Sequence, residues 1–260
     1  MAARGWFYTI GPGMNGNSEI LDKRWRLSGA AAVLLLCHSL TTGAASVQGS
    51  IAAASDYVLR GVSQNQGELA LQGDVQLRFA HGWSAGVWGS QLQLRPGQHT
   101  LEFDAYLQWR HAVNADLDLA LSATHYSYPD DPRPISYDYD ELAVSLAWRD
   151  QLYATASWSP RVNFFTSYGN QLASNRHVLN LELAARRGLS THLEALAGVG
   201  FYDPVGVEYA SYTYGSAALG WHYGKWRAEL AWIAVQGASH RWYSQGEAGG
   251  PLTLSAAWSF

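Results

Sequence analysis

The stretch Leu101-Glu-Phe-Asp-Ala-Tyr-Leu-Gln-Trp-Arg110 alternates between apolar and polar side chains. Phe103 and Trp109 fall on one parity, whereas Glu102 and Asp104 fall on the other. Side chains alternate between the two faces of a β-strand, so a period of two separates an apolar face from a charged one. The stretch therefore predicts a strand that lies between an apolar and a polar environment.

The same alternation recurs in 69–79, 142–149, 179–186, 226–234 and 252–260. With weaker segments included, we count about twelve strands, each about as long as the ~9–11 residues that a tilted strand needs to cross a membrane. Long joins at 62–67, 95–100, 129–137, 160–175, 203–209 and 236–250 alternate with short ones. Outer-membrane barrels show this sorting, and they close because hydrocarbon cannot satisfy an open sheet edge. The sequence predicts an all-β fold, a closed antiparallel transmembrane β-barrel of the outer-membrane type.

Composition excludes several other classes of protein. Charged residues make up 15% of the 260 residues, and the mean hydropathy of −0.15 argues against a bundle of membrane helices. One stretch, around 27–40, is largely apolar, but it is shorter than the ~20 residues of a spanning helix. A net charge of −4 without a basic patch argues against nucleic acid as a partner.

The first 45 residues are predicted to be a signal peptide. Lys23-Arg24-Trp25-Arg26 forms a basic segment, an apolar run follows it, and small residues lead to a cleavage site after Ala45. Met14 would be a more ordinary start, which makes residues 1–13 a candidate upstream extension. We therefore expect a mature domain of residues 46–260 in the outer membrane of a Gram-negative bacterium.

Aromatic side chains gather near the expected strand ends. One set suits the interfacial girdles of a barrel: Trp83, Trp109, Trp148, Trp158, Trp221, Tyr223, Trp226 and Trp258. A second set lies near the expected outer rim, as a girdle or as a stacking track for sugars: Tyr126, Tyr128, Tyr137, Tyr139, Tyr202, Tyr209, Tyr212 and Tyr214. Trp258 and Phe260 look like the C-terminal signal of bacterial outer-membrane proteins. We therefore expect the barrel assembly machinery and outer-membrane lipid as partners.

Several strings in the sequence resemble one bacterial family. The opening strand Ala54-Ser-Asp-Tyr-Val-Leu-Arg-Gly-Val-Ser-Gln64 is followed by Leu71-Gln-Gly73, Gly82-Trp-Ser-Ala-Gly-Val-Trp-Gly-Ser90 and Tyr126-Ser-Tyr-Pro129. Together with 101–106, these strings resemble the TorF-type porins, a proteobacterial outer-membrane family of otherwise unknown function that is also described as Gcw_chp. The resemblance implies a barrel and an outer-membrane location. It implies no mechanism, because the family has no established substrate or catalytic residues.

The inward parity of the predicted strands carries charges of both signs. We expect these residues to line the lumen: Asp74, Arg78, Glu102, Asp104, Arg110, Glu141, Arg149, Glu182, Arg186, Arg227 and Glu229, with Asp56, Arg60 and Glu194 on the same parity. Twelve strands is an intermediate size, since about eight strands fill with side chains and about sixteen leave a wide channel. The charges therefore either line a narrow pore for passive diffusion of small polar or charged solutes, or form a salt-bridge network that plugs a structural or adhesion barrel.

An enzyme is the third alternative. His125 and Ser127 lie two positions apart on the parity that faces lipid, which resembles the His-x-Ser arrangement of outer-membrane phospholipases and lipid A deacylases. Ser127 is followed by Tyr-Pro rather than Asn-Gly, and spacing assigns no orienting acid. The sequence contains no phosphate loop, zinc spacing or dinucleotide motif, so we expect no catalytic residues, no cofactor and no bound metal.

Overall fold

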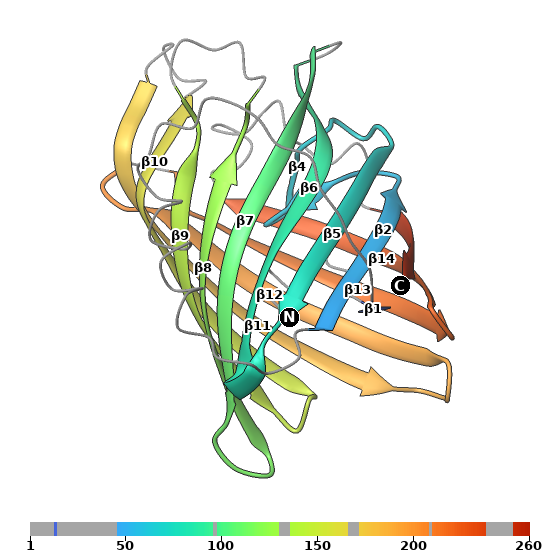
Figure 1. The fold of residues 1–260 in the computed structure, drawn as a ribbon. Helices are drawn as coiled ribbons and strands as arrows, with labels where there is room; N and C mark the ends of the chain where they lie inside the picture. Colours follow the sequence, from blue (N-terminus) through green and yellow to red (C-terminus); the bar gives the residue numbers. More distant parts are fainter. Residues whose placement is uncertain are drawn as a thin grey trace.

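A computed structural model describes residues 13–14, 46–95, 98–129, 136–165, 172–207, 210–237 and 252–260. Most of these residues lie in β-strands (Figure 1). The strands are β1 (Gly13–Met14), β2 (Ser46–Ala54), β3 (Val58–Leu59), β4 (Val62–Ser63), β5 (Ala70–Arg78), β6 (Trp83–Arg95), β7 (Gln98–Ala112), β8 (Leu117–Ser127), β9 (Tyr139–Trp148), β10 (Leu152–Phe165), β11 (Leu172–Gly188), β12 (Leu193–Pro204), β13 (Tyr212–Tyr223), β14 (Trp226–Gly237) and β15 (Leu252–Ser259). No helix in these ranges is long and apolar enough to cross a membrane.

Twelve of these strands form a closed antiparallel barrel, which confirms the predicted fold class. β2 and β5 to β15 pair in chain order, and β2 also pairs with β15, so the sheet closes on itself (Figure 1). Apart from the short strand β1, which pairs with β2 at Gly49 and Gln48, the predicted signal peptide lies outside the described residues.

The two faces of the wall have opposite chemistry, as the alternation predicts. Outward side chains are apolar and exposed, for example Leu183 at 60% and Leu254 at 57%. Inward side chains are polar and buried, for example Gln76 and Glu102 at 1% each. An apolar outer surface of this extent needs a nonpolar surrounding, because single-chain soluble proteins rarely expose it.

Strand β15 pairs with β2 from Ser255 to Ser259, and Phe260 extends this seam. Its N–H donates to the carbonyl oxygen of Gly49 at 2.9 Å, and the Gly49 N–H donates back to the Phe260 carbonyl at 3.2 Å. The Phe260 ring lies over Gly49, where a Cβ would stand 2.5 Å from the ring. The ring therefore occupies the side-chain space that this glycine leaves empty.

The connections between strands lie at the two ends of the barrel, and those at one end are short turns. We call the end with the short turns at 79–82, 113–116, 149–151, 189–192 and 224–225 the turn end, and the opposite one the loop end. Two predicted loops are shorter than expected: β6 and β7 are separated by residues 96–97 alone, and β10 and β11 extend into the predicted loop 160–175. Trp158 is predicted at a strand end but lies near the middle of β10. There its ring stacks on that of His177, with the ring centroids 6.0 Å apart.

Candidate functional site: the lumen and the hairpin that crosses it

Residues 55–69 leave the barrel wall and turn into the lumen at the loop end. β3 and β4 pair as a small hairpin, Val58 with Ser63 and Leu59 with Val62. Arg60 and Gly61 form its two-residue turn, with φ of 51° and 80°, as a type I′ hairpin turn requires. The prediction that a wall strand carries Asp56 and Arg60 is therefore wrong: β2 ends at Ala54, and the inward hairpin carries both residues. We call residues 55–69 the hairpin segment.

Side chains within the hairpin segment hold its base together. Oδ1 of Asp56 accepts hydrogen bonds from the Ser63 hydroxyl at 2.7 Å and from the Gly67 N–H at 3.3 Å. Oδ1 of Asn65 accepts a hydrogen bond from the Tyr57 N–H at 2.7 Å. Two of these bonds satisfy the backbone N–H groups of Tyr57 and Gly67, which lie outside the strands of the wall.

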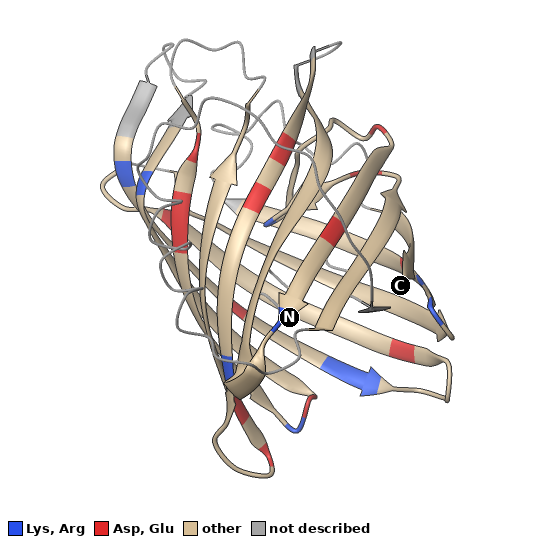
Figure 2. Cartoon of the chain, in the orientation of Figure 1, with Lys and Arg blue, Asp and Glu red and all other residues tan. Residues whose placement is uncertain are grey.

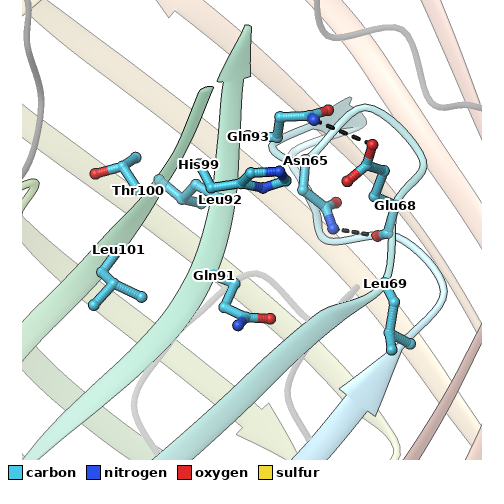
Figure 3. A pocket seen from close by; sticks show the side chains of 9 residues that line it. All are labelled: Asn65, Glu68, Leu69, Gln91, Leu92, Gln93, His99, Thr100 and Leu101. Atoms are coloured by element: carbon cyan, nitrogen blue, oxygen red, sulfur yellow. Dashed lines mark hydrogen bonds between the residues drawn. The ribbon is translucent and has the colours of Figure 1, made fainter. Parts of the chain in front are cut away.

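Strand β6 anchors the base from outside the segment (Figure 3). The Gln93 N–H donates to the Gln64 carbonyl at 3.0 Å, and its side-chain amide donates to Glu68 Oε1 at 3.1 Å. A pocket of about 330 Å³ lies beside this anchor, with the side chain of His99 among those that line it.

Apolar contacts hold the two sides of the hairpin. On one side Tyr57 packs on Trp88 of β6, with ring centroids 5.4 Å apart. On the other side Val62 packs against Tyr212 and Tyr214 of β13. Gly61 lies so close to β13 and β14 that a Cβ there would stand 2.6 Å from Val235 and 2.8 Å from Tyr214. The hairpin therefore contacts strands on both sides of the lumen.

The tip of the hairpin is fixed by Arg60. Nη2 of Arg60 lies 2.6 Å from Oε2 of Glu141 on β9 and 3.3 Å from the hydroxyl oxygen of Ser157 on β10. Only 7% of the Arg60 side chain and 4% of the Glu141 side chain are exposed. Burial works against the charge of Arg60, but the neighbouring Glu141 carboxylate raises the pKa of the guanidinium well above its ordinary value. The guanidinium of Arg60 therefore stays charged inside the lumen.

Tyrosines surround this ion pair. Arg60 lies over the ring of Tyr202 at 5.8 Å. The Tyr214 hydroxyl donates to Glu182 Oε1 at 2.5 Å, and the rings of Tyr126 and Tyr139 stack at 4.2 Å. Tyr126, Tyr212 and Tyr214 are buried inside the barrel, so their assignment to an outer girdle is wrong. Composition could not decide this, because tyrosine suits both an interface and a polar interior.

Further acidic residues that face the lumen lie on β5 and β7, whose red segments are visible in Figure 2. Glu102 and Asp104 of β7 are 1% and 0% exposed. Burial raises the pKa of Tyr128, and Glu102 and Asp104 add to the effect, so its neutral hydroxyl donates to Glu102 at 3.4 Å. On β5, Asp74 accepts a hydrogen bond from the Tyr106 hydroxyl at 3.0 Å. Carboxylates thus outnumber cations in the described interior at this end.

A second cluster of charges lies at the turn end. Glu194 of β12 is buried between Arg186 of β11, at 2.5 Å, and Arg227 of β14, at 2.6 Å. Arg227 also lies 3.7 Å from Glu229, and Arg186 lies 3.0 Å from Asp150. The structure thus brings three residues of the predicted lumen set, Arg186, Arg227 and Glu229, into one network.

Three other predicted lumen residues lie away from both clusters. Arg78 and Arg110 are exposed residues near the turn-end limits of β5 and β7. Arg149 lies in the turn after β9, not on its inward face, and it pairs with exposed Asp116 at 3.1 Å. Within the described ranges, no group of three or more His, Cys, Asp or Glu side chains could hold a metal ion.

Sequence reasoning missed Asn180 and Ser157 as partners inside the lumen. Both lie on the inward parity of their strands, which was the available signal, but both are uncharged. It also missed the partner of His125, whose Nδ1 lies 2.9 Å from Oδ1 of Asp140 on the neighbouring strand β9.

The fold of one solved structure, the KdgM porin, agrees with this architecture. The KdgM porin aligns over 81% of this chain and 99% of its own, at 10% identity and a TM-score of 0.50. The NanC porin covers 81% of this chain at 8% identity and a TM-score of 0.47, and 97% of NanC is covered. At such identities the likeness concerns the fold alone. No curated protein sequence matches the chain.

One family model matches most of the chain, over residues 39–258. The described parts of this range contain eleven complete strands of the barrel wall, nearly all of the twelfth and the hairpin segment. The string 54–64, by which the sequence resembles the family, includes the hairpin that crosses the lumen. The chain belongs to the Gcw_chp family of bacterial proteins of unknown function.

Proposed function

We propose that the protein is an outer-membrane porin of the TorF type, through which small polar or charged solutes diffuse passively. The observation that carries the proposal is the contrast between the two faces of the closed barrel. Its outer face is apolar around the wall, and its inner face carries buried amides and carboxylates such as Gln76, Gln108 and Asp104. A polar interior of this kind holds water and charged solutes at low cost, whereas hydrocarbon outside excludes both.

In this proposal the turn end faces the periplasm and the loop end faces outward, as in other barrels with short periplasmic turns. A solute that enters from outside first meets the hairpin segment and the carboxylates around it. It then passes the cluster of Arg186, Glu194 and Arg227 at the turn end. The charges along this path would sort solutes by sign, because a low-dielectric wall strengthens their field.

Single-channel recording tests the proposal. The chain from Ser46 to Phe260, which contains all twelve wall strands, is refolded and inserted into a planar bilayer. Discrete, reproducible current steps are expected. Folded barrel protein migrates differently on a gel before and after boiling. If protein that passes this check gives no current, a pore is contradicted and the plugged barrel is favoured. The hairpin that crosses the lumen is the observation that supports a plugged barrel.

A lipid-face acyl hydrolase remains the second candidate because His125 has an acidic neighbour. Asp140 holds its Nδ1 at 2.9 Å, as a triad acid would hold a catalytic histidine. The described structure records no hydrogen bond from His125 to Ser127, so the nucleophile of such a site is not yet activated. Deacylation of phospholipid or lipopolysaccharide that is lost in Ser127→Ala and Asp140→Asn would establish this activity. No turnover above background would exclude it.

A further inference from the structure

The hairpin segment is held unequally at its two ends. At the base, four side chains of the segment and Gln93 of β6 form a set of mutually supporting hydrogen bonds. At the tip, the ion pair between Arg60 and Glu141 joins two elements 81 residues apart in the chain. Other contacts of the tip include the hydrogen bond to Ser157, the ring of Tyr202 and the close packing of Gly61.

The backbone conformation at the tip also depends on contacts with neighbouring residues. Arg60 has φ of 51°, a left-handed value that residues other than glycine, asparagine and aspartate rarely adopt. Such a conformation persists when neighbouring contacts favour it over the alternatives. Removal of the carboxylate at Glu141 takes away the strongest of these contacts and leaves a buried guanidinium facing a neutral group.

Because its tip contacts β9 and β10, the hairpin narrows the lumen. In strand order, β9 and β10 lie on the opposite side of the barrel from β2 and β5, between which the segment is inserted. The hairpin therefore spans the interior rather than lining one side of it. Any solute that passes the loop end must move between the hairpin and the wall.

The hairpin tip carries a buried positive charge, that of Arg60. Among the described residues Arg60 is the one buried cation, and the buried carboxylates Glu141 and Glu182 face it from β9 and β11. Without Arg60 these carboxylates would attract cations more strongly and repel anions. With Arg60 in place, the field of these carboxylates where the hairpin crosses the lumen is partly cancelled.

We propose that the hairpin β3–β4 is the constriction of the pore, and that Arg60 is the residue that both holds it across the lumen and sets its preference between cations and anions. This inference rests on the proposed porin function. It assigns two separable consequences to a single ion pair: conductance measures whether the hairpin is held, and the permeability ratio measures selectivity.

The first test compares Arg60→Gln with Glu141→Gln in single-channel recordings. Both variants break the ion pair, so both should conduct severalfold more than wild type or open more often. Arg60→Gln removes a positive charge and should raise the potassium-to-chloride permeability ratio, whereas Glu141→Gln removes a negative charge and should lower it. Arg60→Lys keeps the charge but loses the planar guanidinium, so it should keep the wild-type ratio. Arg149→Gln, which removes a cation that lies in the turn after β9 and pairs with exposed Asp116, is the matched control and should leave the opening unchanged.

The second test reads the position of the hairpin without any current. Glu141→Gln keeps Arg60, and trypsin cleaves after arginine when the backbone is accessible. In folded wild-type protein the bond between Arg60 and Gly61 should resist trypsin, because both residues are buried. In folded Glu141→Gln, mass spectrometry should detect cleavage at this bond.

The outcomes separate the inference from the function on which it rests. If wild type conducts and both variants match it in conductance and in resistance to trypsin, the role of the hairpin is overturned and the pore stands. If conductance rises but the two permeability ratios do not move in opposite directions, Arg60 does not determine selectivity. If no variant conducts, including one in which 55–69 is replaced by a short turn and which is shown to be folded, the porin function fails. The trypsin result then still decides whether the ion pair holds the hairpin.

Discussion

An arginine on the outer face of the barrel should destabilise it according to its depth in the membrane. Leu183 of β11 and Leu189 in the turn that follows are both outward leucines, with exposures of 60% and 57%. They differ by six positions, which at about 3.3 Å per residue and a strand tilt of about 40° separates them by about 15 Å along the membrane normal. If Leu189 lies near the edge of an apolar band about 25 Å tall, Leu183 lies near its middle.

Leu183→Arg should therefore cost about 2–4 kcal/mol of folding free energy, and Leu189→Arg about 0–1 kcal/mol. The larger cost corresponds to roughly a 30- to 1000-fold change in the folding equilibrium. Guanidinium titration of the refolded protein in phospholipid vesicles measures both, with the gel shift between folded and unfolded forms as the signal. Equal costs for the two variants would refute the assignment of this surface to hydrocarbon, because water would then contact both positions.

Three further variants test individual packing contacts. Gly200→Ala places a Cβ 2.2 Å from the ring of Tyr214 and should cost about 1–3 kcal/mol in the same titration, whereas Gly188→Ala, with no atom within 4 Å, should be neutral or nearly so. Glu194→Gln weakens the hydrogen bond from Arg186 and the ion pair with Arg227, and it should cost about 1.5–3 kcal/mol, while a shift of the reversal potential towards anion selectivity reports the lost negative charge. Deletion of Phe260 removes two backbone hydrogen bonds across the seam and should lower the temperature at which the gel shift disappears; an unchanged temperature would contradict its role in closure.

The wall could be predicted because its chemistry is local. Each strand has apolar surroundings on one side and polar groups on the other. The side chains of 101–110 and 252–260 therefore alternate between apolar and polar at every second residue. The inward placement of Glu102 and Glu182 follows from parity alone and agrees with the structure.

The hairpin segment could not be predicted in this way. Asp56 and Arg60 share a parity, so alternation assigns them to a wall strand, and the signals against that assignment are Gly61 and Gly67. The contact that places Arg60 across the lumen involves Glu141, which is 81 residues away in sequence. A pairing of this separation leaves no periodic trace in a single sequence.

Closure of the seam by β15 has a consequence for how the protein is made. Ser55 and Leu254, which are hydrogen-bonded across this seam, are 199 positions apart, so the barrel cannot close until nearly all of the described chain has been synthesised and exported. Contacts of such sequence separation form slowly, because the entropy of the intervening chain must be lost first. In the meantime both edge strands present unpaired amides to the periplasm, where they can pair with the wrong chain. A chaperone that holds the unfolded chain in transit would therefore affect the yield of this barrel more than small changes in its final stability would.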